Sequence, residues 1–158
     1  MAETEIRSVL VPVTGGDLLL PNATVAEIVD YSEPESIADS PRWLLGNVLW
    51  RGWQVPVISF STMAGVAESE SVAGARFCIT KCLIDSDRLP YLALLTQGYP
   101  RLVTVTETAL TEVPEDDLPA AVAGRIIISG REARVPDLDQ MAELVLQAAY
   151  GRPSKTSS

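Results

Sequence analysis

Few residues of this sequence could form a catalytic or metal-binding site. The chain contains no histidine, so it lacks the commonest general base and metal ligand. Glu115, Asp116 and Asp117 form an acidic cluster, but Mg²⁺ usually needs phosphate or further ligands as well. No Walker loop or G-x-G-x-x-G occurs, and neither Ser59 nor Ser129 lies in a G-x-S-x-G sequence. We therefore expect a protein without catalysis, cofactor or metal, although a small enzyme using two converging carboxylates is an alternative.

The two cysteines, Cys78 and Cys82, lie in one run that reads as a β-strand. On an extended strand they would be about 13 Å apart on the same face. That separation is too large for a disulfide. The sequence predicts two reduced core thiols, as in a cytoplasmic protein. A C-x₃-C metal pair is the alternative, but the sequence offers no other soft ligand.

Arg51 stands between Trp50 and Trp53, next to Gly52. Arginine and tryptophan are favoured at the centres of protein interfaces, so this group could anchor a partner. The alternative is a turn in which the arginine head is solvated, its stem lies on a tryptophan, and the tryptophans fill the core. The residues alone favour the turn.

Charge and hydropathy narrow the classes of partner. The net charge is −9 with no run of basic residues, which argues against nucleic acid and against an anionic membrane surface. No apolar run approaches the roughly 18 residues that span a bilayer, and residues 1–20 lack the layout of a signal peptide. We expect a cytoplasmic protein without direct membrane insertion.

The elements that would position these residues are mostly short strands separated by Gly and Pro turns, a pattern typical of small β-barrels. Thr24 and Glu27 have the spacing of a capping box, which predicts a short helix over 24–30, with a continued strand as the alternative. Met141, Leu144, Val145 and Ala148 predict an amphipathic helix over 139–150, capped by Asp137 or Asp139. Strands are predicted over residues 5–13, 18–21, 43–60 (two strands meeting near Arg51-Gly52), 76–85, 89–96, 102–105, 126–128 and 133–135, with a mobile loop over 64–75 and a disordered tail over 153–158.

One pattern occurs twice. Gly46 and Gly52 enclose an apolar strand, and so do Gly124 and Gly130, 78 residues later. Each pair is followed by a strand with a Val-Pro step, at Pro56 and Pro136. The pattern suggests two similar half-domains of about five strands each, forming one domain over residues 1–152. Chance similarity between two hairpins is the alternative.

The first half of the chain resembles the CheW-like domain of chemotaxis coupling proteins. That family shows an apolar-Pro step, a Val-x-Glu-Ile segment, a Pro, a Gly before a short apolar strand, an Arg-Gly turn and a Pro-Val strand. Ser59 stands where the family usually has Asp, and Trp50 and Trp53 replace smaller aliphatics. The matching residues are Pro21, Val25, Glu27, Ile28, Pro41, Gly46, Arg51, Gly52, Pro56 and Val57.

The resemblance implies a mainly β fold of two intertwined five-stranded SH3-like barrels with a short N-terminal-half helix and a C-terminal helix. It implies a non-enzymatic scaffold whose partners are a CheA-type histidine kinase and the cytoplasmic tip of a chemoreceptor. The divergence of the second half resembles accessory CheW-like proteins of type IV pilus (twitching motility) systems. A small-ligand-binding β-barrel is the alternative. The residues that we expect to contact partners are Val25, Glu27, Ile28, Trp50, Arg51, Gly52 and Trp53.

Overall fold

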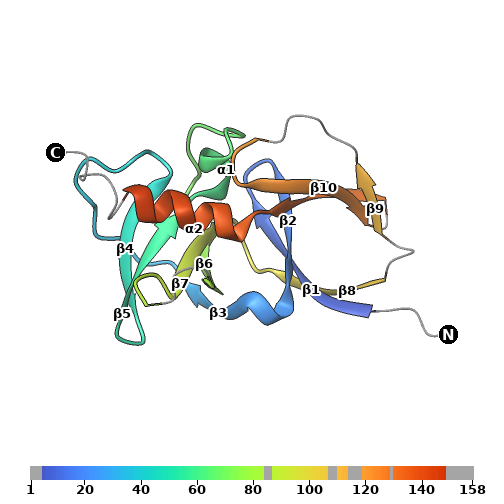
Figure 1. Ribbon diagram of the computed structural model, residues 1–158, viewed down its shortest axis with the longest axis horizontal. Coiled ribbons are helices and arrows are strands. Elements are labelled where there is room, and N and C mark those ends of the chain that lie inside the picture. Colours follow the sequence, from blue (N-terminus) through green and yellow to red (C-terminus); the bar gives the residue numbers. More distant parts are fainter. Residues whose placement is uncertain (1–4, 84–86, 107–109, 114–118, 129, 149–158) are drawn as a thin grey trace.

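A computed structural model describes residues 5–83, 87–106, 110–113, 119–128 and 130–148. It consists of two β-sheets with few helices, and Figure 1 shows helix α2 lying across the front between them. Sheet A has the order β8 (Arg101–Thr106), β1 (Glu5–Val13), β2 (Gly16–Pro21), β11 (Arg131–Pro136), β10 (Val122–Ile128) and β9 (Leu110–Val113). Sheet B has the order β3 (Val25–Asp30), β6 (Arg76–Lys81), β7 (Tyr91–Thr96), β5 (Trp53–Ile58) and β4 (Leu44–Trp50). The helices are η1 (Asn22–Thr24), α1 (Phe60–Met63) and α2 (Leu138–Leu146).

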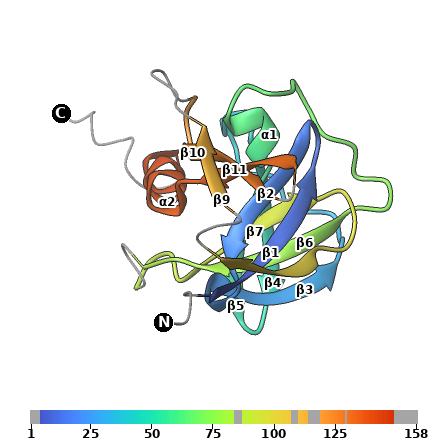
Figure 2. The ribbon, with the colours of Figure 1, turned by 90° about the vertical axis from the view of Figure 1, so that its right-hand side faces the viewer.

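The two sheets are intertwined along the chain. Sheet A combines the first hairpin, β1–β2, with the later strands β8 to β11, whereas sheet B combines β3, β4 and β5 with β6 and β7. In Figure 2 the β1–β2 hairpin consequently runs through the middle of the molecule. Each sheet has one parallel pair, β2 with β11 and β5 with β7. The predicted architecture of two intertwined units is confirmed, with β9 as a sixth strand in sheet A.

The repeated glycine pattern corresponds to two hairpins with the same register. Every Cα partner pair of β4 and β5, from Leu44 with Ile58 to Trp50 with Trp53, recurs 78 residues later in β10 and β11. Both hairpins shift register at the matching place, before Gly46 and before Gly124. Such bulges bend a strand and strengthen its twist, so both sheets curve at the same point.

The repeat continues into the helices that follow the hairpins. Ser59 caps α1 by accepting from the backbone N–H of Thr62, and Asp137 caps α2 by accepting from that of Gln140. These two caps are also 78 residues apart. Asp137 is one of the two caps predicted for the C-terminal helix, which begins at Leu138 and ends at Leu146.

The remaining strands can be matched through their pairings. Arg134 of β11 pairs with Leu18 of β2, while Val57 of β5 pairs with Ala93 of β7. Followed through the antiparallel registers, these pairs make β2 equivalent to β7, β1 to β6 and β8 to β3. With the residue of sheet A given first, the equivalent residues include Ser8 and Phe77, Val9 and Cys78, Leu10 and Ile79, Asp17 and Tyr91, Arg101 and Glu27, Val105 and Tyr31, Ile128 and Trp50, and Arg131 and Trp53.

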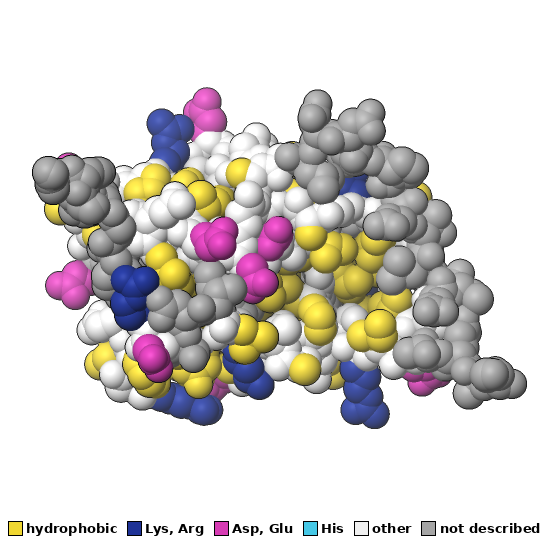
Figure 3. All heavy atoms as spheres, in the orientation of Figure 1, with side chains coloured by type: hydrophobic (Ala, Val, Ile, Leu, Met, Phe, Trp, Pro, Cys, Tyr) yellow, Lys and Arg dark blue, Asp and Glu magenta, His cyan; other side chains and the backbone are white. Residues whose placement is uncertain are grey.

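Three apolar clusters hold these elements together. A central core lies between the sheets and takes residues from both, together with Phe60 and Met63 of α1 and Met141 and Val145 of α2. Each sheet also curves around a smaller cluster on its other face. The cluster of sheet A is open on one side as an apolar groove of about 240 Å³, visible as the apolar surface right of centre in Figure 3. Its lining residues are Ile6, Ser8, Leu19, Pro21, Val105, Ile126 and Val135.

The cysteines are reduced and buried in the central core, as predicted. Burial raises the pKa of Cys78 to about 12. The pKa of Cys82 also rises to about 12, first because of burial and then because of the nearby carboxylate of Asp139. Both thiols therefore behave as small apolar side chains at neutral pH.

The helix predicted over 24–30 is wrong, because Val25–Asp30 forms strand β3. This segment pairs with β6 along its length, so its backbone groups are satisfied by the sheet. Its apolar side chains also divide between two cores: Val25 and Ile28 pack on the central core, Ala26 and Val29 on the cluster of sheet B. The strand shifts register between Val25 and Glu27, and the extra residue explains why side chains three positions apart share a face.

The segment 64–75 contains no strand or helix in the structure, and one side chain ties it to both sheets. Glu70 accepts hydrogen bonds from the backbone N–H of Thr14 at 2.8 Å, the hydroxyl of Ser59 at 2.6 Å and the side chain of Gln97 at 3.4 Å. The described helices include none that is long and apolar enough to cross a membrane. The predicted tail over 153–158 lies outside the described residues.

Candidate partner-binding site

The tip of the β4–β5 hairpin is a two-residue turn formed by Arg51 and Gly52. Both have positive φ, 51° and 82°. Two central residues with positive φ characterise a type I′ turn, whose twist matches that of the flanking strands. Glycine adopts this conformation freely, but an arginine does so at a cost of about 1 kcal/mol or more. The turn thus places a strained arginine at the end of the hairpin.

The carboxylate of Glu27 connects β3 to this hairpin. Its Oε1 accepts from the indole Nε1 of Trp50 at 3.0 Å and from Nη2 of Arg51 at 3.1 Å. The guanidinium of Arg51 also lies over the Trp50 ring, 4.7 Å from its centroid, which is within the range of a cation–π contact. Two donors of the hairpin, an indole and a guanidinium, therefore meet at a single carboxylate oxygen of β3.

The ring of Tyr91 lies beside both tryptophans of the hairpin. Trp50 is buried and meets the ring of Tyr91 edge-on, with 4.8 Å between centroids. The ring centroids of Trp53 and Tyr91 are 6.4 Å apart, and Trp53 is 43% exposed. Arg51 and Glu27 are also exposed, at 66% and 41% of their side chains. The hairpin end thus offers a cation, an anion and an indole face to solvent on a rigid base.

The structure brings together five of the seven predicted contact residues and separates two. Glu27, Trp50, Arg51, Gly52 and Trp53 share the hairpin end. Val25 and Ile28 lie on the same strand as Glu27 but pack, half-buried, against the central core.

Tyr91 belongs to this cluster and was missed from the sequence. It lies at the start of β7, distant in sequence from both tryptophans, and no local spacing indicates the contact. Only the pairing of β5 with β7 brings its ring beside theirs. In the part of the chain that the structure describes, no group of three Cys, Asp or Glu side chains could hold a metal ion.

Comparisons with known proteins agree with this fold. A family model described as "CheW-like domain" matches residues 7–145, and the chain therefore belongs to the CheW-like domain family. A crystal structure of the scaffolding protein TtCheW from Thermoanaerobacter tengcongensis is similar, with a TM-score of 0.74 and 17% sequence identity over 96% of this chain and 93% of that chain. At this identity the likeness concerns the fold. No curated protein matches the sequence closely enough to be informative.

Proposed function

We propose that this chain is a non-enzymatic cytoplasmic scaffold that couples chemoreceptors to a CheA-type histidine kinase in a bacterial chemosensory pathway. The observation that carries the proposal is the Glu27–Arg51–Trp50 cluster with exposed Trp53, in a chain of the CheW-like domain family. Family membership supports the class of activity. The cluster nominates the surface that performs it.

The conformation of Arg51 supports a role in binding. An arginine with a φ of 51° is strained where Asn or Gly would fit easily. Strain of this kind persists where a side chain is needed at that position. Because the guanidinium carries several fixed donors, Arg51 can bond Glu27 and still offer N–H groups to a partner's carboxylate or carbonyl.

The stability that the cluster contributes is too small to explain why these side chains are placed together at the hairpin end. Ion pairs between exposed side chains are worth about 0–1 kcal/mol, and the Arg51–Glu27 pair is largely exposed. The indole N–H of Trp50 is satisfied by Glu27, which leaves the exposed indole of Trp53 as the side chain most suited to insert into a partner. We therefore assign the hairpin end to recognition.

A pull-down from the source cytoplasm, read by mass spectrometry, tests the proposal. Wild-type protein should recover a CheA-type kinase or a chemoreceptor, Arg51→Glu should lose one of them, and Arg42→Glu should retain both. Arg42 is an exposed arginine outside the cluster and is therefore the matched control. Recovery of neither protein by folded wild type would sink the coupling function. The kinase that is recovered also assigns the output to chemotaxis or to type IV pilus twitching.

A charge exchange separates recognition from structure. The double variant Glu27→Arg with Arg51→Glu keeps an opposite-charge pair at the hairpin end while reversing what faces a partner. We expect it to lose the partner while remaining folded, at a cost of about 1 to 3 kcal/mol in the free energy of unfolding, because the indole N–H of Trp50 loses its acceptor. If the exchange retained full binding, the pair would serve only to hold the hairpin.

A further inference from the structure

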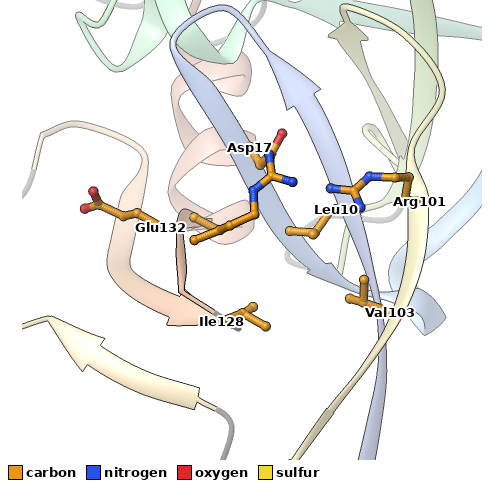
Figure 4. A pocket seen from close by; sticks show the side chains of 8 residues that line it. Leu10, Asp17, Arg101, Val103, Ile128 and Glu132 are labelled. Atoms are coloured by element: carbon orange, nitrogen blue, oxygen red, sulfur yellow. The ribbon is translucent and has the colours of Figure 1, made fainter.

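Sheet A has a second opening at one end of its cluster. A pocket of about 160 Å³ has an apolar floor of Leu10, Val103, Ile128 and Ala133, and Asp17, Arg101, Arg131 and Glu132 complete its lining. Figure 4 shows Arg101 reaching from β8 toward Leu10, while the carboxylate of Glu132 turns away from the pocket. A cavity of roughly 150 Å³ is large enough to hold a benzene ring.

The equivalent place in sheet B is filled by aromatic side chains. Ile128 corresponds to Trp50, and Asp17 corresponds to Tyr91, whose rings meet with 4.8 Å between centroids. The backbone registers of the two sheets agree at these positions, so the smaller side chains of sheet A leave room where sheet B holds rings. The empty space in this pocket therefore matches the place of an aromatic ring in sheet B.

The charges of the pocket differ from those of the whole chain. Arg101 takes the place of Glu27, and within the described residues it makes no ion pair. Arg131 pairs with Asp17 at a distance of 3.5 Å, and Glu132 pairs with Nε of Arg125 at 2.6 Å. The guanidinium of Arg101 is therefore the charge of this lining that no ion pair among the described residues balances. In a protein of net charge −9, this pocket has a local excess of positive charge.

We propose that this pocket binds a small aromatic carboxylate, with the ring on Leu10 and Ile128 and the carboxylate against Arg101 and Arg131. The apolar floor removes the ring from water, and the planar guanidinium groups match carboxylate geometry. The same chemistry could come from a free acid or from a polypeptide that ends in an aromatic residue. The site does not involve the hairpin end of sheet B and stands independently of the proposed scaffold function.

Titration of the ¹⁵N-labelled chain with phenylacetate, followed by NMR, tests the site. We expect shifts of the amides around Leu10, Arg101 and Ile128, with a Kd on the order of 1 mM. Phenylacetamide, the neutral isostere, should bind roughly tenfold more weakly, since it lacks the charge-assisted hydrogen bonds. Equal binding of the two compounds, or shifts elsewhere only, would overturn the proposal. The tetrapeptide Gly-Gly-Gly-Phe with a free carboxylate identifies the source: tighter binding than phenylacetate assigns the site to a chain terminus, weaker binding to a free acid.

Three variants should change the affinity of the pocket for phenylacetate in different directions. Arg101→Gln should weaken phenylacetate binding roughly tenfold, whereas Asp17→Asn should strengthen it, because Arg131 loses its competing carboxylate. Ile128→Trp, which copies Trp50, should fill the pocket and abolish binding while a thermal melt shows it folded. Arg42→Gln is the control and should bind as wild type does. The proposal fails if Arg101→Gln and Asp17→Asn change the affinity in the same direction, whatever the fate of Ile128→Trp.

Discussion

Sheet B packs four aromatic side chains in or against its own cluster and carries a fifth, Trp53, exposed at its hairpin end, whereas sheet A has none at the equivalent positions. Strand order, hairpin register and helix caps repeat between the two, so the backbone does not dictate what fills each interior. Aromatic side chains close sheet B and brace the hairpin that carries Arg51, whereas smaller ones leave sheet A open. The sheet B residues are Tyr31, Trp50, Trp53, Phe77 and Tyr91, and their sheet A equivalents are Val105, Ile128, Arg131, Ser8 and Asp17.

This difference indicates how one backbone pattern can serve two purposes. The filled sheet presents its polar groups on a rigid base, which suits recognition of a protein surface. The open sheet keeps apolar floor accessible between charged rims, which suits capture of a small apolar anion. Exchanging or removing features at equivalent positions of the two sheets should therefore have unequal effects.

The largest effect on stability is expected from Phe77→Ser, which places in sheet B the residue type that sheet A has at the equivalent position, Ser8. Phe77 is fully buried against Tyr31, with 5.3 Å between ring centroids, so its loss should cost about 3 to 5 kcal/mol in the free energy of unfolding. Ser8→Ala in sheet A is the matched change and should cost under about 1 kcal/mol. Urea denaturation measures both. Similar costs for the two variants would mean that sheet B does not depend on its ring.

A glycine pair probes the two bulges. Gly46 has a φ of 140°, and a Cβ there would lie 2.3 Å from the carbonyl oxygen of Glu35, which pairs with Asn47. Gly46→Ala should therefore destabilise the chain by about 2 to 3 kcal/mol. At Gly124 a Cβ meets nothing within 4 Å, and Gly124→Ala should stay within about 0.5 kcal/mol of wild type. Thermal melts of the two variants should rank in this order, and the reverse ranking would refute the assigned role of Gly46.

Removing the two helix caps should give stability costs that differ less than those of the two glycine variants. Asp137→Ala removes the cap of α2 and should cost about 1 kcal/mol. Ser59→Ala removes the cap of α1 and also a donor to the partly buried carboxylate of Glu70, which raises the expected cost to about 2 kcal/mol. Denaturation of Ser59→Ala, Glu70→Gln and the double variant, compared in a double-mutant cycle, isolates the contribution of the Ser59–Glu70 hydrogen bond. Additive costs would show that the hydroxyl and Glu70 are not coupled.

The smallest effect at neutral pH comes from the thiols of the central core. Their pKa values of about 12 lie above the ordinary 9.0, so the unfolded chain releases these protons first. Stability from this source is complete below pH 9 and falls as pH rises toward 12, by at most about 1.4 kcal/mol per pH unit for each thiol. Cys78→Val, which copies Val9 of sheet A, should reduce that alkaline slope. Unfolding measured between pH 7 and 11 tests this, and an unchanged slope would contradict the assignment to Cys78.

Local patterns determined most of the strands, the C-terminal helix and the repeat itself. Alternating β-branched residues, Gly turns and the Asp137 cap act within a few residues, so their consequences can be predicted from the chain alone. The 78-residue echo predicted two similar units because glycines recur at matching places around two apolar strands. The same reasoning placed Arg51 and Gly52 at a turn between two tryptophans.

Tertiary pairing decided what those local patterns left open. Thr24 and Glu27 have the spacing of a capping box, yet β3 forms because β6 satisfies its backbone and two cores take its side chains. The crossing of β1 and β2 into sheet A, the contact of Tyr91 with the tryptophans and the pocket beside Arg101 all join residues far apart in sequence. Such contacts depend on which strands pair across the whole chain, and no local spacing encodes that choice.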